Sequence, residues 1–173
     1  PCLPGYLLMV DNLGDSGGEI IEILKNSMNV KRYVVCENRI VAIAAEKNIS
    51  EACGCFVKNV LEELLIECRA VIGGKAARAS ELHGLYKNCM DALGLKHVYG
   101  LKENVLEYDR MYGYRVAYGL DSTLKKAIKE KVFTAEFSAL VDSELGITIE
   151  EFFRNNLNLT DTAAKLYIHR NTL

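Results

Sequence analysis

Four polar residues near the end of the chain have side chains that can bond to DNA. They follow the run TAAKLYI and are His169, Arg170, Asn171 and Thr172. Their donors and acceptors suit base edges and phosphate oxygens, and a recognition helix presents such side chains to the major groove at its N-terminus. We therefore expect these four residues to be the DNA contacts of the chain.

A short helix must stand just before these residues if they are to begin a recognition helix. Thr160 and Asp161 suit its N-cap and first turn, because their side-chain oxygens accept hydrogen bonds from backbone N–H groups. Ala163 is small where a second helix has to come close, and Tyr167 occupies the position at which many helix-turn-helix proteins have a turn glycine. The space between the helices is expected to be filled by Leu166, Ile168 and Leu173.

The run TAAKLYIHRNTL resembles the C-terminal helix-turn-helix of the bacterial regulators of sugar-diacid utilisation and purine catabolism. In those families it continues into an arginine-bearing recognition helix, of which one turn is present here, so we expect a fragment of a longer protein. The resemblance implies a cytoplasmic transcription regulator whose partner is DNA. An effector small molecule of unknown identity would bind an upstream domain that is absent here. An ordinary helical hairpin without a DNA role is the alternative.

The composition excludes several classes of protein. The chain has 173 residues, half of them apolar, which allows one ordinary domain with an appendage or two small domains. Proteins that bind DNA over much of their surface are strongly basic, and the net charge of −2 excludes that class. No apolar run is long enough to span a membrane, and the N-terminal PCLPGYLLMV lacks the basic segment of a signal peptide. We expect no membrane partner.

Cysteine and histidine spacing argues against a metal site. His83, His97 and His169 are dispersed, and no C-x-x-C pair occurs among the cysteines, which are Cys2, Cys36, Cys53, Cys55, Cys68 and Cys89. Two of them, Cys53 and Cys55, lie in one predicted helix, where side chains two residues apart face different ways. Cys36 and Cys68 lie in apolar strand-like runs and are expected to be buried. We expect reduced structural cysteines, no metal and no cofactor.

Residues 1–112 are predicted to form one α/β unit. Apolar patterns predict strands over 5–11, 32–36, 40–46, 68–73 and 104–109, and helices over 19–29, after Ser50 and over 80–94. The turn between the second and third strands is expected to be a tight hairpin in which Asn38 tolerates a positive φ. Gly73 and Gly74 are expected to end the fourth strand. The order β-α-β-β-α-β-α-β predicts an α+β fold with helices packed on a sheet that contains antiparallel strands.

This order resembles the GGDEF domain of diguanylate cyclases and, more closely, the degenerate GGDEF-like domain that precedes the helix-turn-helix in sugar-diacid regulators. In cyclases the hairpin carries a Gly-Gly-Asp-Glu-Phe loop, whose glycines let the backbone approach the nucleotide and whose acid helps to hold Mg²⁺. Here the hairpin is VVCENRIV, with Glu37 as its carboxylate and no glycine, and the first strand ends in Asp11.

These replacements predict that the domain is not an enzyme, because one or two carboxylates do not make a two-metal site for phosphoryl transfer. We expect an inactive GGDEF-like domain that relays a signal or makes dimer contacts. The alternative is a nucleotide-sensing or nucleotide-handling module derived from a cyclase fold. Gly17 and Gly18, before a predicted helix, could cradle an anion on backbone amides or form a flexible turn.

Residues 113–145 are predicted to be a helical linker and residues 146–173 the truncated helix-turn-helix. Ser122 and Thr148 are expected to cap helices in these two parts. The linker carries a basic run at 125–131, interpreted as a solvated helix face with phosphate contact as the alternative. Its apolar stripe consists of Leu124, Ile128, Val132, Phe137, Leu140 and Val141. Because helix-turn-helix proteins usually present two recognition helices to DNA, we expect a homo-oligomer, with this stripe or the α/β surface as the contact.

Overall fold

Five strands form one mixed sheet in the first part of the chain. The computed structural model describes residues 2–134, 136–137, 139, 144–155 and 158–172. It divides into two units, one ending at Gly119 and the other beginning at Leu120. The domain ranges expected from the sequence, 1–112, 113–145 and 146–173, remain a prediction.

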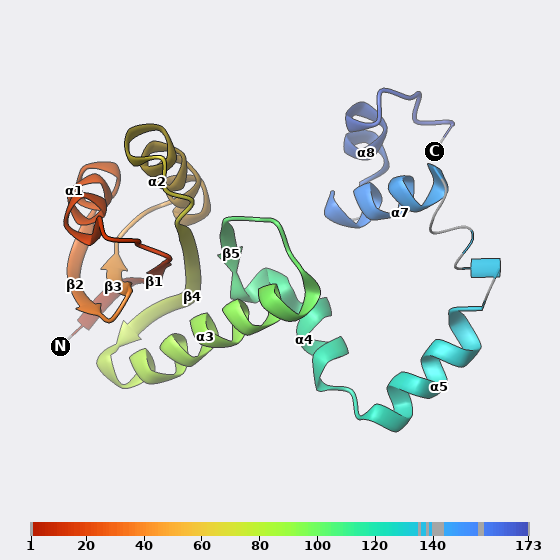
Figure 1. Ribbon diagram of the computed structural model, residues 1–173, viewed down its shortest axis with the longest axis horizontal. Helices are drawn as coiled ribbons and strands as arrows, with labels where there is room; N and C mark the ends of the chain where they lie inside the picture. Colours follow the sequence, from red (N-terminus) through yellow and green to blue (C-terminus); the bar gives the residue numbers. More distant parts are fainter. Residues whose placement is uncertain (1, 135, 138, 140–143, 156–157, 173) are drawn as a thin grey trace. The chain divides into compact units, whose positions relative to one another are not determined.

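The first unit has the predicted order of strands and helices (Figure 1). Its strands are β1 (Cys2–Asp11), β2 (Val30–Cys36), β3 (Arg39–Ala44), β4 (Arg69–Arg78) and β5 (Val105–Glu107). Its helices are α1 (Gly17–Ser27), α2 (Ile49–Leu64), α3 (Leu82–Tyr99) and α4 (Tyr112–Gly119), with 3-10 turns at Ala79–Glu81 and Tyr108–Met111. The strands lie in the order β2-β3-β1-β4-β5, and all neighbours are antiparallel except β4 and β5. The predicted α+β fold, with helices packed on a sheet that contains antiparallel strands, is thereby confirmed.

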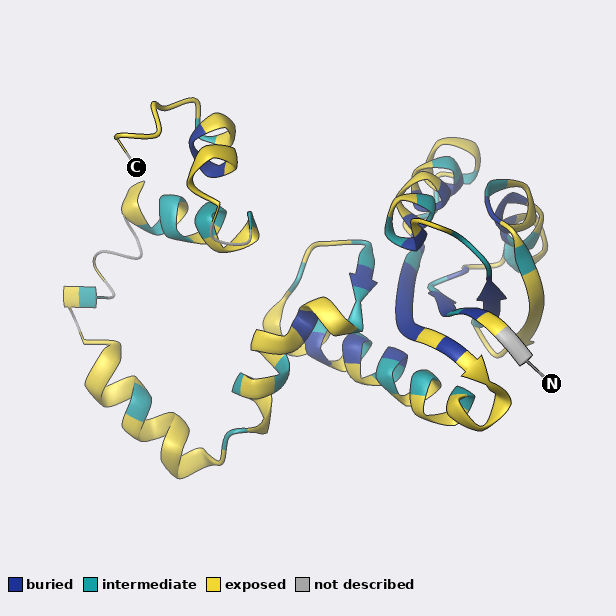
Figure 2. Ribbon diagram, turned by 180° about the vertical axis from the view of Figure 1, so that it is seen from behind, coloured by how far each residue is buried: buried dark blue, intermediate teal, exposed yellow. Residues whose placement is uncertain are grey.

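Alternation along β1 explains how the sheet acquires two apolar faces. Leu8 and Val10 point to the face covered by α1 and α2, whereas Leu7 and Met9 point to the face covered by α3. All four are buried. Figure 1 shows α3 on the opposite side of the sheet from α1 and α2, and in Figure 2 the sheet-facing side of α3 is partly dark blue and partly teal.

The helix α1 buries the predicted face, formed by Ile20, Ile23 and Leu24. The start of α2 differs from the prediction. Its N-cap is Asn48, whose side chain accepts a hydrogen bond from the backbone N–H of Glu51, and Ser50 lies inside the helix. Asparagine and serine are equally good caps, so local propensity alone could not choose between two neighbouring candidates.

In the hairpin between β2 and β3, the residue with a positive φ is not the one predicted. Glu37 has φ +53°, and Asn38 is not among the described residues with positive φ. A two-residue turn can put the left-handed conformation at its first central position, and here that position is Glu37. The hairpin itself is confirmed, with Cys36 paired to Arg39.

The glycines Gly73 and Gly74 do not end a strand, as the sequence suggested. The strand β4 continues through them to Arg78, with a register shift against β1 at this point and φ +131° at Gly74. A hypothetical Cβ on Gly73 would lie 2.3 Å from the carbonyl oxygen of Leu85 in α3. The glycine pair therefore makes a bulge at which a helix approaches the backbone of the strand.

Three buried cysteines behave as small apolar residues of the core. Burial raises the pKa of the thiols to about 12 for Cys53, about 11 for Cys68 and about 12 for Cys89. They are therefore protonated near neutral pH and are poor nucleophiles and poor metal ligands. Cys55 is exposed, as its offset from Cys53 predicts. Cys36 is exposed and not buried, because it is the last residue of the edge strand β2, six of whose seven residues are exposed.

The second unit contains α5 (Ser122–Val132), α7 (Glu144–Arg154) and α8 (Leu159–Lys165). The N-cap of α5 is Asp121 and not Ser122; its carboxylate accepts hydrogen bonds from two backbone N–H groups, which lowers its pKa. The helix ends at Val132, whereas the predicted stripe continues to residues 140 and 141, which lie outside the described residues. Among described helices, none is both long and apolar enough to cross a membrane.

Candidate nucleic-acid interface

The helices α7 and α8 pack against each other around two small buried residues. Ala163, predicted to allow a close approach, is 3% exposed, and Thr162 beside it is fully buried. The start of α7 differs from the prediction, because the helix already begins at Glu144. Thr148 therefore lies inside it, where its hydroxyl donates to the carbonyl of Glu144, four residues earlier.

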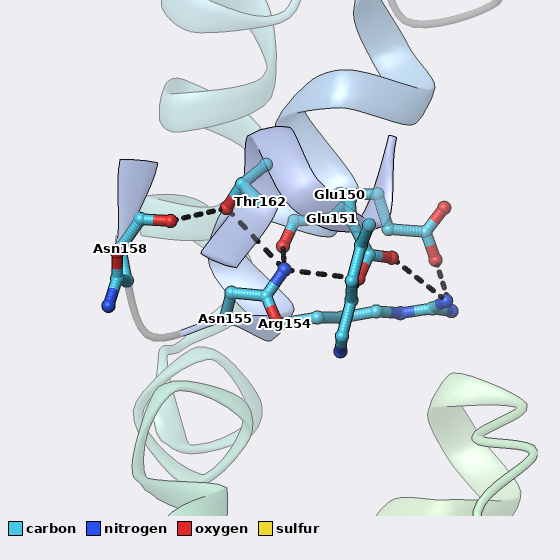
Figure 3. Close-up of polar contacts among 7 residues, drawn as sticks. Glu150, Glu151, Arg154, Asn155, Asn158 and Thr162 are labelled. Carbon is cyan, nitrogen blue, oxygen red and sulfur yellow. Dashed lines mark hydrogen bonds and ion pairs between the residues drawn. The ribbon is translucent and has the colours of Figure 1, made fainter. Parts of the chain in front are cut away.

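Polar contacts at the junction connect the end of α7 with α8 (Figure 3). The amide nitrogen of Asn155 donates to the backbone carbonyl of Glu151 at 2.9 Å and lies 3.4 Å from the hydroxyl of Thr162. That hydroxyl donates to the backbone carbonyl of Asn158 at 2.7 Å. The buried hydroxyl thus has both an acceptor and a donor, which removes the cost of burying it.

The cap of α8 is Asn158 and not the predicted Thr160. Its side-chain oxygen accepts from the backbone N–H groups of Thr160 and Asp161 at 2.9 and 3.2 Å, and its amide donates to the Asp161 carboxylate. Thr160 lies within the first turn. The aspartate stabilises this helix N-terminus both by that bond and by its charge.

Ion pairs add a second link between the helices. Glu151 of α7 lies 3.4 Å from Lys165 of α8 and 3.9 Å from Arg154 of its own helix. Arg154 also pairs with Glu150 at 2.7 Å. The Glu151 carboxylate is 18% exposed, so its contact with Lys165 is less screened than a surface pair.

Helix α8 ends in a Schellman turn that directs the chain toward the four predicted DNA contacts. The backbone N–H of Ile168 donates to Ala163 at 3.0 Å and that of Tyr167 to Ala164 at 3.3 Å. Tyr167 has φ +56° and is 96% exposed. The turn position that many helix-turn-helix proteins fill with glycine is therefore left-handed here and is occupied by a residue with a Cβ.

Replacing Tyr167 by glycine should strengthen this turn. Glycine adopts φ +56° without the steric cost of a Cβ, and the exposed tyrosine ring loses little contact. After the extra backbone entropy of glycine is subtracted, we expect a gain of about 0.5–1 kcal/mol. Amide hydrogen exchange in α8 should slow accordingly. Tyr167→Ala is the control, since it removes the ring but keeps the Cβ; an equal gain from alanine would refute the backbone explanation.

Beyond this turn, residues 169–172 make one further hydrogen-bonded turn. The Nδ1 atom of His169 accepts from the backbone N–H of Asn171 at 3.3 Å, and its carbonyl accepts from Thr172 at 2.8 Å. This is the pattern of an N-cap residue, so Arg170 is in the first position of the turn. All four predicted contact residues are exposed and are brought together here.

Two of the three apolar residues expected between the helices are described, and they differ in how far they are buried. Leu166 is half-buried, Ile168 is 38% exposed, and Leu173 lies outside the described residues. Ile168 follows the left-handed residue of the turn, which directs the chain away from α8. Its expected place between α8 and a recognition helix that begins at His169 stays a prediction, because the described residues contain no helix after α8.

Asp11 and Glu37, the two carboxylates expected at the end of the first strand and in the hairpin, lie in the first unit. The two oxygens of Asp11 accept from Arg39 Nε and Arg69 Nη1, each at 2.9 Å. Register explains the contact, because Asp11 is directly opposite Arg39 on β3 and Arg69 on β4. Glu37 is exposed in the hairpin turn. Within the described residues, no group of three histidine, cysteine or acidic side chains is arranged to hold a metal ion.

Comparison with known families agrees with the C-terminal geometry. Residues 145–173 match the family model of the PucR C-terminal helix-turn-helix domain. The resemblance drawn from the sequence is thereby confirmed for this segment, which is a helix-turn-helix DNA-binding domain of the kind found in bacterial transcription regulators. No curated protein matches the chain. The chain is also similar to the solved structure of a regulator of polyketide synthase expression from Bifidobacterium adolescentis, with 14% identity and a TM-score of 0.47, over 99% of this chain and 68% of that chain.

Proposed function

We propose that this chain is part of a cytoplasmic bacterial transcription regulator that binds DNA through His169, Arg170, Asn171 and Thr172. The observation that carries the proposal is the turn at 166–169. It connects the buried junction of α7 and α8 to a hydrogen-bonded turn at 169–172 on which these four polar side chains are exposed. Exposed donors that follow a packed helix pair and would begin a recognition helix suit the major groove.

For the first unit we propose a GGDEF-like fold without cyclase activity, which relays a signal or makes contacts between subunits. The order of its elements supports the fold. The ion pairs of Asp11 support the absence of activity, because both oxygens of this carboxylate are bound by arginines. An effector small molecule would be bound elsewhere in the natural protein.

Changing Arg170 to alanine should weaken specific DNA binding by about 1–3 kcal/mol if its guanidinium reads a guanine, and should relax specificity at that base pair. If Arg170 touches phosphate alone, affinity should fall evenly across sequences, and the salt dependence of binding should decrease by about one ion. Footprinting and salt titration of the natural-length protein on the DNA upstream of its own gene measure both quantities.

Arg110→Ala is the matched control, since it removes the same charge from an exposed site in the first unit. It should leave affinity and salt dependence unchanged. Unaltered affinity and salt dependence in Arg170→Ala would show that the DNA contacts have been assigned to the wrong residues.

A further inference from the structure

The strand β2 is an edge of the sheet that is unusually open. It pairs with β3 on one side, and six of its seven residues are exposed. Natural edge strands are usually protected against pairing by charges, proline or a bulge. In β2 the charges Lys31 and Arg32 and a register shift are confined to its first part, and the sequence Tyr33–Cys36 carries no charge and no proline.

The hairpin determines which backbone groups of β2 are available. Cys36 and Arg39 flank a two-residue turn and form a hydrogen-bonded pair, so hydrogen-bonded pairs alternate along the hairpin from there. The N–H and C=O groups of Cys36 and Val34 therefore point toward β3. Those of Val35 and Tyr33 point outward, where another strand can bind them.

The side chains on this edge are apolar on both faces. Tyr33 and Val35 are opposite Ala42 and Ile40, on the face covered by α1, where Lys25 lies 5.2 Å from the Tyr33 ring centroid. Val34 is opposite Val41, on the other face. It borders a hollow of about 400 Å³ whose lining includes Val41, Ile43, Leu82 and Tyr86. The three apolar residues of the edge are 44%, 55% and 47% exposed.

We propose that β2 pairs with β2 of a second copy of this chain, antiparallel and centred on Val34, to form a continuous sheet across a two-fold axis. Registers centred on Tyr33, Val34 or Val35 use the outward backbone groups of this apolar segment, and the charged residues favour one of them. Centring on Val34 pairs Tyr33 of each copy with Val35 of the other and brings Lys31, at the register shift near the start of β2, close to Glu37, the first residue of the partner's hairpin turn.

The two neighbouring registers are less favourable. Centring on Val35 places Tyr33 opposite Glu37 and carries Lys31 past the end of the partner's β2, because the chain turns back into β3 at Glu37–Asn38, so Lys31 has no carboxylate opposite it. Centring on Tyr33 sets Lys31 opposite Val35 and Arg32 opposite Val34, and leaves Glu37 without a cationic partner across the interface. The occupant that fits this edge by hydrogen bonding, apolar contact and charge together is thus the strand itself.

Disulfide trapping of the 173-residue chain tests the register. In a background with serine at positions 2, 36 and 55, Val34→Cys should form a covalent dimer on mild oxidation, because the two residues 34 face each other at a non-hydrogen-bonded pair, where Cβ atoms are close. Val35→Cys is the matched control and should remain monomeric, since its partner is Tyr33. Dimer formation by Val35→Cys and not by Val34→Cys, or by neither variant, would overturn the proposal.

Charge exchange provides a second, reversible measurement. In sedimentation experiments Lys31→Glu and Glu37→Lys should each weaken the dimer by about tenfold, and the double exchange should restore it. Lys47→Glu, an exposed lysine outside the edge, should have no such effect. A wild-type chain that stays monomeric at high concentration would refute the pairing, as would a double exchange that fails to restore it. These experiments use no DNA, so the pairing can fail while the proposed DNA binding stands, and the reverse.

Discussion

Replacing Gly73 by alanine should lower the free energy of unfolding of the first unit by about 3 kcal/mol or more. The added Cβ would lie 2.3 Å from the Leu85 carbonyl oxygen and 2.7 Å from the Cys89 sulfur. The first of these atoms belongs to the backbone of α3, so it cannot move aside as a flexible side chain would. The whole helix must shift from β4, and with it Cys89, Ala92 and Leu95, which are buried against the sheet.

Gly94→Ala is the matched control for this prediction. Gly94 is in the same helix and is exposed, and no atom beyond its chain neighbours and the adjacent turns of helix backbone lies within 4 Å of its hypothetical Cβ. Alanine there should raise stability by about 0.5–1 kcal/mol, because glycine is a poor residue for the middle of a helix. Urea unfolding of both variants measures the difference. A Gly73→Ala protein as stable as wild type would mean that α3 does not approach β4 in this way.

The two glycines show what a sequence pattern can and cannot predict. The apolar run before them correctly predicted a strand, since strand propensity is local. The same pattern suggested that the strand ends at Gly73, because paired glycines are typical of turns. A bulge under a helix also requires glycine, and only the contact with Leu85, twelve residues later in the chain, distinguishes the two cases.

Helix starts illustrate a finer limit of prediction from sequence. Ser50, Ser122 and Thr160 were expected to be N-caps, and in each case an asparagine or aspartate one or two residues earlier has that role. Asn, Asp and Ser are almost equivalent as caps and Thr is only slightly weaker. The conformation of the preceding loop therefore determines at which residue the helix begins. That conformation depends on the rest of the fold.

At the candidate DNA interface, the sequence correctly predicted which residues are exposed, but it did not predict the contacts between the helices before them. The four polar residues are exposed on one turn, as expected, and Ala163 is buried. The contacts of Asn155 and Thr162 were missed, because both residue types are common on solvated surfaces. The one available signal was the pair Asn158 and Thr162, four residues apart at a helix start, where a threonine hydroxyl can reach the carbonyl of the cap residue.

Replacing Asp11 by asparagine should destabilise the first unit by about 2 kcal/mol. The carboxylate is 14% exposed and pairs with Arg39 and Arg69 at 2.9 Å each. Asparagine keeps the size but removes the charge, so two guanidinium groups would face each other across β1 with no anion between them. Loss of one partner from a fully buried pair costs about 3–5 kcal/mol. These arginine side chains are 30% and 36% exposed, and solvent screens part of that cost.

Asp15→Asn is the control, because Asp15 is exposed in the loop after the same strand and should tolerate the change. A double-mutant cycle with Arg39→Met should recover part of the loss, since removing one arginine removes the repulsion.

The Asp11→Asn variant also tests whether Asp11 binds a metal ion. Millimolar Mg²⁺ or Mn²⁺ would raise the melting temperature of wild type but not of Asp11→Asn if the carboxylate were a metal ligand. We expect neither protein to respond, because the arginines already supply the positive charge that a metal would bring to a cyclase site.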